Sequence, residues 1–330
     1  MAGKIDPQLN NDMPQGSPRR PLAGRVIDIV DGFVDFLVLL FILLLISFGI
    51  FSLWDTHRMY QSAAPTVLET YKPDKEPYLS FGELHKINPD VFAWLTVYGT
   101  HIDYPVTQAE DNDKYINTSA TGEFALYGCP FLDYRNSPDF SDLNSIIYAH
   151  HMDKGMMFGD LDLFLEKSFF DEHEYGNLYF GGKQHGLHMF AMIEADAYDF
   201  TIYDTEVTEE NQQEYLQHIL DEAKFTRDIG VKEGDHIILL STCAGGLTNL
   251  RYILACKLTD ETYEDPFYEE PTAKEGLPFF LTLPWWWYAG AGLLVLLCIL
   301  LWIHKKKRKA EADDSDDLTY ENREKSEDDT

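Results

Sequence analysis

The chain has 330 residues, a formal net charge of −30 and 45% hydrophobic residues. This apolar content supports a packed core and excludes wholesale disorder, while the acidic balance argues against nucleic-acid binding, which needs a clustered basic surface. The four cysteines are too few for a disulfide scaffold, and no CxxC pair suggests structural zinc.

Two uncharged apolar segments predict membrane helices. The first lies within residues 33–54 and the second spans residues 285–303. Each is close to the roughly 20 residues that cross a hydrocarbon core about 30 Å thick. A signal peptide is the alternative for the first segment, but it lies far from the N-terminus and no small-x-small cleavage site follows it. We therefore expect two membrane-spanning helices.

Basic residues outside these segments predict their orientation. They precede the first segment and follow the second at Arg19, Arg20, Arg25, Lys305, Lys306, Lys307, Arg308 and Lys309. Because positive charge stays on the cytosolic side, the N-terminal segment 1–32 and the basic, then acidic, tail 304–330 should both be cytosolic. The sequence thus predicts a two-pass protein of the cell membrane, with residues 55–284 outside the cell.

The exterior region is predicted to be mainly β. A stalk should cover residues 55–77, and a short helix should end before Pro89. Strands are then expected at 91–97, 102–106, 124–131, 145–149, 178–180, 187–195, 236–242 and 252–258. Short strands separated by turn residues predict an all-β barrel or sandwich.

Two helical stretches should interrupt this pattern. Residues 209–225 place apolar side chains on one helical face and acidic residues in the first turn, which predicts an amphipathic helix. A second helical piece is expected at about 157–167. The proline-rich linker 263–284 should then return the chain to the membrane.

A thiol and an arginine flank the turn between the last two predicted strands. Cys243 ends the apolar strand and is followed at once by Ala244-Gly245-Gly246. This position presents the thiol to solvent, although a free cysteine can equally be a small core residue. Arg251 opens the next strand, where its guanidinium could stabilise a thiolate or an oxyanion. An exposed surface arginine is the alternative.

Two adjacent histidines, His150 and His151, end the strand predicted at 145–149. A histidine at one strand end can reach a cysteine at a neighbouring strand end, which is the arrangement that nucleophilic thiol catalysis needs. Neighbouring residues on a strand point to opposite faces, so the two histidines cannot line one site together. Their spacing does not choose between them.

Several separate segments carry a family resemblance: 87–95, 99–106, 111–116, 131–136, 148–152 and Leu240-Ser241-Thr242-Cys243. On these segments, the region 78–262 resembles the sortases, specifically class B. There are departures from the family pattern, since Ala149 replaces the usual glycine and Ala244 stands where some relatives have an acidic residue. These departures concern peptide specificity more than catalysis.

The resemblance implies a closed, eight-stranded sortase-type β-barrel with a few peripheral helices, in addition to the two transmembrane helices. It implies that Cys243 is the nucleophile, His150 the catalytic histidine and Arg251 the stabiliser of an oxyanion or of the substrate backbone. Substrate-binding positions implied in the same way are Asn112, Ile116, Ser241 and Thr242. No metal and no cofactor is expected.

The implied function is a transpeptidase that acts through a cysteine thioester. Its partners would be secreted proteins with a C-terminal sorting signal, and its acceptor an amine of a cell-wall precursor or a pilin lysine. The second membrane helix favours the pilin variant. A purely hydrolytic cysteine peptidase and a catalytically inactive membrane-anchored binding domain are the alternatives.

Other motifs receive structural interpretations. Asp265-Pro266-Phe267 is similar to the lid motif of pilus-building sortases, but it follows the barrel instead of preceding it, so we interpret the match as coincidence. Cys129 and Cys256 could pair in an oxidising exterior. Nothing in the sequence places them together, so two unpaired, part-buried thiols are expected.

Overall fold

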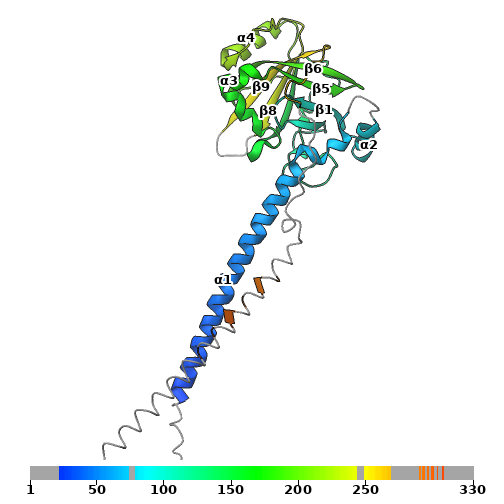
Figure 1. Cartoon of the computed structure of the whole chain (residues 1–330). Helices are drawn as coiled ribbons and strands as arrows, with labels where there is room; N and C mark the ends of the chain where they lie inside the picture. The colour runs from blue at the N-terminus through cyan, green and yellow to red at the C-terminus, as the bar shows by residue number, and fades with distance from the viewer. Residues whose placement is uncertain are drawn as a thin grey trace, which may run out of the picture. The chain divides into compact units, whose positions relative to one another are not determined.

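The computed structural model describes residues 22–73, 79–243 and 249–268, together with isolated positions between 290 and 307. The chain divides into two compact units (Figure 1), one comprising residues 1–54 and 276–330 and the other residues 55–275.

A long apolar helix, α1 (Leu22–Ala63), begins the described chain. Its part Ile29–Ala63 is long and apolar enough to cross a membrane, and it is the one such helix in the described part of the chain. The helix extends past both predicted ends because no proline interrupts it, while Pro65 lies just beyond its last residue. The predicted stalk is therefore helical as far as Ala63.

The second predicted membrane segment, 285–303, lies mostly outside the described residues, and only scattered positions within it are described, as helical. Of the two predicted membrane helices, the described part of the chain therefore shows the first only. A second crossing of the membrane stays a prediction.

The unit of residues 55–275 is built around one nine-stranded sheet with the order β5-β1-β2-β3-β4-β8-β9-β6-β7. Its strands are β1 (Val91–Val97), β2 (Asp103–Thr107), β3 (Phe131–Leu132), β4 (Asn144–His150), β5 (Tyr175–Phe180), β6 (Lys183–Asp196), β7 (Ala223–Thr226), β8 (Ile237–Cys243) and β9 (Leu250–Thr259). An additional pairing of β5 with β6 closes eight of them into a ring. The predicted closed eight-stranded barrel is confirmed, and β7 adds a strand outside the ring.

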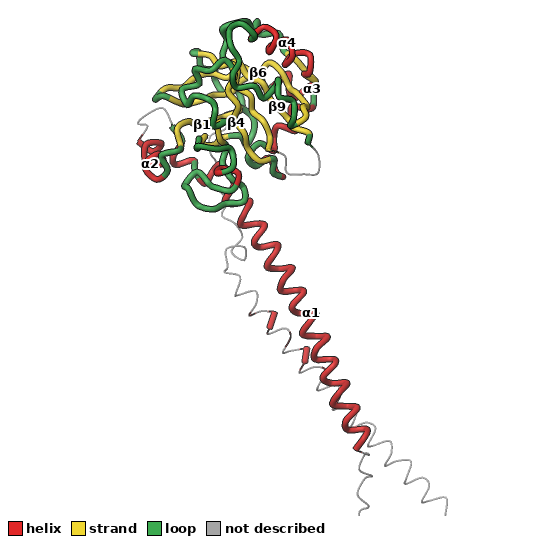
Figure 2. The backbone as a smooth tube through the Cα atoms, turned by 180° about the vertical axis from the view of Figure 1, so that it is seen from behind, coloured by secondary structure: helices red, strands yellow, loops and turns green. Residues whose placement is uncertain are grey.

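Short helices surround the barrel (Figure 2). They are α2 (Leu79–Ile87), α3 (Lys167–Glu172), α4 (Gln212–Glu222) and the 3₁₀ turns Pro65–Val67, Glu69–Tyr71, Lys114–Ile116, Asp153–Gly155 and Gly159–Leu165. The helix expected at 209–225 ends earlier, because Ala223 becomes extended and the following residues pair with β6 as β7. The helical piece expected at 157–167 is a 3₁₀ turn followed by α3.

The adjacent strands β4 and β8 are buried on both faces. Ile147 and Leu240 belong to one apolar cluster, whereas Ile146 and Leu239 belong to a second one with residues of α4. Burial on both faces accounts for the continuous apolar run in β8, which does not alternate as a half-exposed strand would.

After β9 the chain forms a strap, residues 260–268, which docks on the barrel. The ring of Tyr263 stacks on Tyr175 with centroids 4.0 Å apart, and Phe267 stacks on His173 at 4.3 Å. The predicted linker therefore begins as part of the folded unit. Within its Asp265-Pro266-Phe267 tripeptide, the phenylalanine packs against the barrel.

Candidate active site

The parallel pairing of β4 with β8 sets the geometry of the candidate site. Their register pairs Tyr148 with Ser241, Ala149 with Thr242 and, at the end of both strands, His150 with Cys243. Backbones of neighbouring strands lie about 4.8 Å apart, and paired residues share a face of the sheet. The histidine and cysteine singled out in the sequence therefore stand side by side at two strand ends.

Arg251 joins this face from β9. The antiparallel register of β8 and β9 pairs Ser241 with Ile253, and the backbone N–H of Tyr252 donates to Thr242 Oγ1 at 3.2 Å. The described pairing of β8 with β9 ends there, and the same register continued by two residues along each strand would set Arg251 opposite Cys243, on the same face. Arg251 itself lies on β9, where it pairs with Ala195 of β6.

A groove of about 510 Å³ runs over this face. Its walls include five of the seven predicted site residues, namely Asn112, Ile116, His150, Thr242 and Arg251. The described residues that line it are Asn112, Asp113, Ile116, Phe131, Arg135, Tyr148, His150, Ala197, Phe200, Tyr203, Thr242 and Arg251. The side chain of Cys243 lies outside what the structure describes, so its position is given by the backbone pairing alone.

His150 is oriented by a backbone carbonyl. Its Nε2 lies 2.7 Å from the carbonyl oxygen of Ile116. A carbonyl only accepts hydrogen bonds, so Nε2 must carry the proton. Nδ1, to which the described residues offer no hydrogen bond, is left as the exchangeable position. Ile116 thus acts through its backbone as well as lining the groove.

His151 serves a different purpose. Its Nε2 lies 2.6 Å from Asp162 Oδ2, its ring contacts Tyr252 edge-on, and it is absent from the groove lining. This hydrogen bond links the end of β4 to the 3₁₀ turn Gly159–Leu165. Of the two adjacent histidines, the structure puts only His150 in the groove.

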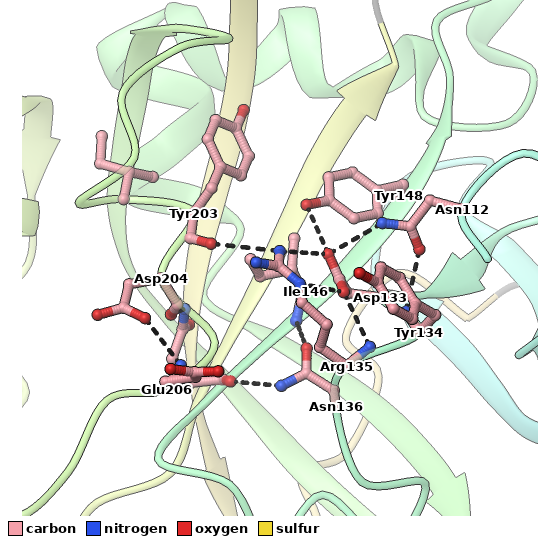
Figure 3. A network of polar contacts seen from close by, with 12 residues as sticks. Asn112, Asp133, Tyr134, Arg135, Asn136, Ile146, Tyr148, Tyr203, Asp204 and Glu206 are labelled. Atoms are coloured by element: carbon pink, nitrogen blue, oxygen red, sulfur yellow. Dashed lines mark hydrogen bonds and ion pairs between the residues drawn. The ribbon is translucent and has the colours of Figure 1, made fainter. Parts of the chain in front are cut away.

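Asn112 sits in a polar network at one wall of the groove (Figure 3). Its Nδ2 donates to Asp133 Oδ2 at 3.1 Å, and its Oδ1 accepts from the backbone N–H of Tyr134 at 3.0 Å. Asp133 also accepts hydrogen bonds from Arg135 and from the Tyr148 hydroxyl. The predicted substrate-binding amide is therefore fixed in one orientation.

Ser241 does not line the groove. It is fully buried, and its Oγ lies 3.0 Å from the Tyr203 hydroxyl, whose residue does line the groove. The serine, predicted to bind substrate, thus supports a tyrosine that faces the groove.

Comparison with known proteins places this arrangement in a family. The chain is 35% identical over 189 residues to Sortase B of Staphylococcus aureus, covering 54% of the chain and 74% of that protein. It is 39% identical over 162 residues to Sortase B of Listeria monocytogenes, covering 49% of the chain and 65% of that protein, slightly less than two thirds of its length. The chain belongs to the sortase B family. No family model matches it.

A solved structure agrees with this assignment. A class B sortase of Streptococcus pyogenes involved in pilus biogenesis is 41% identical, with a TM-score of 0.51, and the match covers 54% of this chain and 97% of that one. The family consists of cysteine transpeptidases, so the thiol-bearing end of β8 in this sortase is where its chemistry is expected.

The remaining thiols of the sortase domain are unsuited to that chemistry. Cys129 and Cys256 are free and buried, and burial raises the pKa of the Cys129 thiol to about 12. Burial likewise raises the pKa of Cys256. Both stay protonated at neutral pH, and the thiolate is the nucleophile. They are unpaired as expected, but fully rather than partly buried.

Seven described groove residues were not predicted from the sequence, among them Arg135, Tyr148, Phe200 and Tyr203. Arg135 lies in a segment that carries the family resemblance, but the resemblance assigns it no role. Phe200 is 79% exposed, yet it and Tyr203 come from a loop after β6 that carries no motif. Only the folded chain brings that loop beside β4 and β8.

Proposed function

We propose that this sortase B family member is a transpeptidase that cuts a C-terminal sorting motif and rejoins the cleaved protein to an amine. The observation that carries the proposal is the pairing of His150 with Cys243 at adjacent strand ends, together with Arg251, which lines the same groove as His150. A nucleophile, a proton-transfer group and an anion stabiliser are the parts that acyl transfer through a thioester requires.

In the proposed first step, the Cys243 thiolate attacks the scissile carbonyl carbon. The negative charge that develops on the carbonyl oxygen is stabilised by Arg251. His150 then donates a proton to the departing amine, so the C–N bond breaks and a thioester remains. In the second step, neutral His150 takes a proton from the incoming amine as it attacks the thioester, and the thiolate leaves.

The hydrogen bond of His150 to the Ile116 carbonyl supports this role. It fixes the ring as an aspartate does in a catalytic triad, but without a negative charge. The ring is thereby held with Nδ1 available for proton transfer.

The proposed substrates are secreted proteins bearing a C-terminal sorting signal, as the family implies. The acceptor is the amine of a cell-wall precursor or of a pilin lysine. Of these two acceptors, the pilin lysine is supported by the likeness to a streptococcal class B sortase involved in pilus biogenesis. Supplying both amines together, and measuring which product forms, separates the two.

We place the catalytic domain outside the cell, on the membrane. Helix α1 supports the first anchor, and the basic residues before it and in the tail support a cytosolic location for both termini. In this arrangement the sortase meets secreted proteins as they leave the membrane.

The test is product analysis on the full-length protein with a sorting peptide, with and without an added amine. Wild type should give the amide with the amine present, and Cys243→Ala should give no product. Cys298→Ala, which removes a thiol from the predicted second membrane segment 285–303, is the matched control and should behave as wild type. If wild type hydrolyses the peptide equally with and without the amine, the protein is a peptidase instead. If wild type does not cleave the peptide, the result supports a binding domain.

A further inference from the structure

A buried carboxylate without an assigned role lies beneath one wall of the groove. Asp133, directly after β3, has no exposed surface. Its Oδ1 accepts from the Arg135 backbone N–H at 3.0 Å and from Arg135 Nε at 2.9 Å. Its Oδ2 accepts from Arg135 Nη2 at 2.8 Å, Asn112 Nδ2 at 3.1 Å and the Tyr148 hydroxyl at 3.2 Å. Three of the groove residues are thus held by one side chain (Figure 3).

The paired carboxylate fixes the guanidinium of Arg135. Two parallel N–H···O bonds set both the plane and the direction of the fork, and Nη2 also lies 3.5 Å from the Tyr203 carbonyl. Nη1 has no hydrogen bond with any residue that the structure describes. The side chain is 41% exposed, so this end is available to a peptide in the groove.

Asp133 also decides which atoms of Asn112 and Tyr148 are available. A carboxylate only accepts, so it must face Nδ2 of Asn112, which leaves the second N–H of that amide for the groove. The Tyr148 hydroxyl is committed as a donor to Asp133, and its ring stacks on Tyr203 with centroids 6.2 Å apart. The wall therefore presents N–H donors in fixed directions.

The same carboxylate balances charge. The charged residues that line the groove in the described part of the chain are Asp113, Arg135 and Arg251, and Asp133 pairs directly with Arg135. With Asp133 ionised the four charges cancel. Without it, the groove would carry a net positive charge of one next to Cys243.

We propose that Asp133 is a positioning residue of the groove: it fixes Asn112, Arg135 and Tyr148 for the substrate and cancels the charge of Arg135. This inference deepens the proposed function and rests on it for the role in peptide binding. The charge balance stands independently, because it concerns only access to Cys243.

The charge is tested by alkylating Cys243 in the full-length protein with iodoacetate, an anion, and with neutral iodoacetamide. Modified Cys243 is quantified by peptide mass spectrometry, because other cysteines are present. Asp133→Asn should raise the iodoacetate/iodoacetamide rate ratio about twofold at low ionic strength, and added salt should remove the increase.

The double variant Asp133→Asn/Arg135→Gln separates charge from positioning, because it removes one charge of each sign. Its iodoacetate/iodoacetamide rate ratio should return to the wild-type value. Its KM for a sorting peptide should be about tenfold above that of wild type, as in Asp133→Asn, and its kcat should change less than threefold. Asp142→Asn is the matched control: that carboxylate is bound by Asn136 and Ser137, neither of which lines the groove. It should change neither measurement.

The outcomes are decisive in each case. An unchanged rate ratio in folded Asp133→Asn, or an equal change in Asp142→Asn, would overturn the charge balance. A wild-type KM in the double variant would overturn the positioning role. If the single variant Asp133→Asn does not unfold cooperatively, the double variant is used for the test in its place. If wild type cleaves no peptide, the proposed function fails, whereas the alkylation ratios still test the charge.

Discussion

At the scale of single residues, hydrogen-bond partners distinguish His150 from its neighbour His151. Its sequence position offered two histidines and no way to choose between them without the family resemblance. The structure supplies a physical reason: His150 faces the groove and hydrogen-bonds the Ile116 carbonyl, while His151 pairs with Asp162. The partners lie 34 and 11 residues away, so no local pattern could have shown them.

Ser241 is a predicted site residue that the structure does not place in the groove. The resemblance predicted that it binds substrate, but the side chain is buried against Tyr203. Tyr203 comes from the loop after β6, which has no recognisable motif. A contact between two such distant residues depends on the fold as a whole.

Arg251 is expected to need its guanidinium and not merely its charge. Arg251→Lys keeps the positive charge but loses the planar fork of donors. We expect kcat/KM for a sorting peptide to fall about 100-fold, the loss typical of removing an oxyanion donor. Steady-state peptide cleavage measures this. Activity within threefold of wild type would show that charge alone suffices.

Asp133 should make stability depend on pH in one direction. Burial alone would raise its pKa, but hydrogen bonds from Arg135 and Asn112 outweigh this and lower the pKa. A lowered folded-state pKa gives stability that is present above the unfolded value of about 3.9 and is lost as the pH falls through the folded value.

Wild type should therefore melt at a higher temperature than Asp133→Asn, by an amount that is constant from pH 8 to about 5 and shrinks below about 4. Thermal unfolding followed by circular dichroism measures the difference. A gap that widens on acidification would show that the assigned ionisation is wrong.

At the scale of elements, most strands follow from their composition. The predicted strand 91–97 coincides with β1, and those at 145–149, 236–242 and 252–258 match β4, β8 and β9 within a few residues. The expected strand at 124–131 is mostly loop, with only Phe131–Leu132 in the sheet. Its apolar residues Phe124 and Leu126 are instead exposed, at 78% and 63%.

β7 was missed because its residues continue the apolar pattern of α4. Helical periodicity extends to Phe225, but the edge of β6 offers backbone hydrogen bonds, and Ala223–Thr226 takes them. Tertiary pairing here overrides local propensity. The same limit applies to barrel closure, since the pairing of β5 with β6 at the seam cannot be recognised from separate strands.

The strap should be sensitive to Gly99. This glycine has a φ of +74°, and a Cβ there would lie 2.5 Å from His173 Cδ2 and 2.8 Å from Phe267 Cδ2. Gly99→Ala would strain the turn and separate the stacked rings. Gly182, with a φ of +81° and no atom within 4 Å of a Cβ, is the matched control for backbone strain alone.

We expect Gly182→Ala to cost about 1 kcal/mol and Gly99→Ala to cost a further 1–3 kcal/mol or so from overpacking. Urea unfolding of the two variants gives the comparison. Equal costs would mean that the strap does not pack against His173 in solution.

At the scale of the whole molecule, the predicted membrane topology is directly testable. Protease added to cells stripped of their wall should digest the barrel domain, while epitope tags at both termini stay protected until detergent is added. The positive-inside distribution of basic residues is the physical reason. A C-terminal tag that is digested without detergent would rule out the second crossing and leave α1 as the anchor.

The barrel architecture was anticipated at this scale and is confirmed, whereas the roles of the site residues stay predictions. Strand composition predicted the fold class, and only the family resemblance predicted the closed barrel and assigned roles to Cys243, His150 and Arg251. What no sequence argument supplied is the layer beneath the groove, where Asp133 joins three segments of the chain.

The most direct test of the account is to trap the acyl-enzyme. Full-length protein is mixed with a sorting peptide without any amine, quenched in acid within seconds, and examined by intact-mass spectrometry with peptide mapping. We predict a mass increase equal to the acyl fragment, located on Cys243, absent in Cys243→Ala and discharged by added hydroxylamine. Turnover of the peptide by Cys243→Ala at the wild-type rate, or an adduct on another residue, would contradict the account.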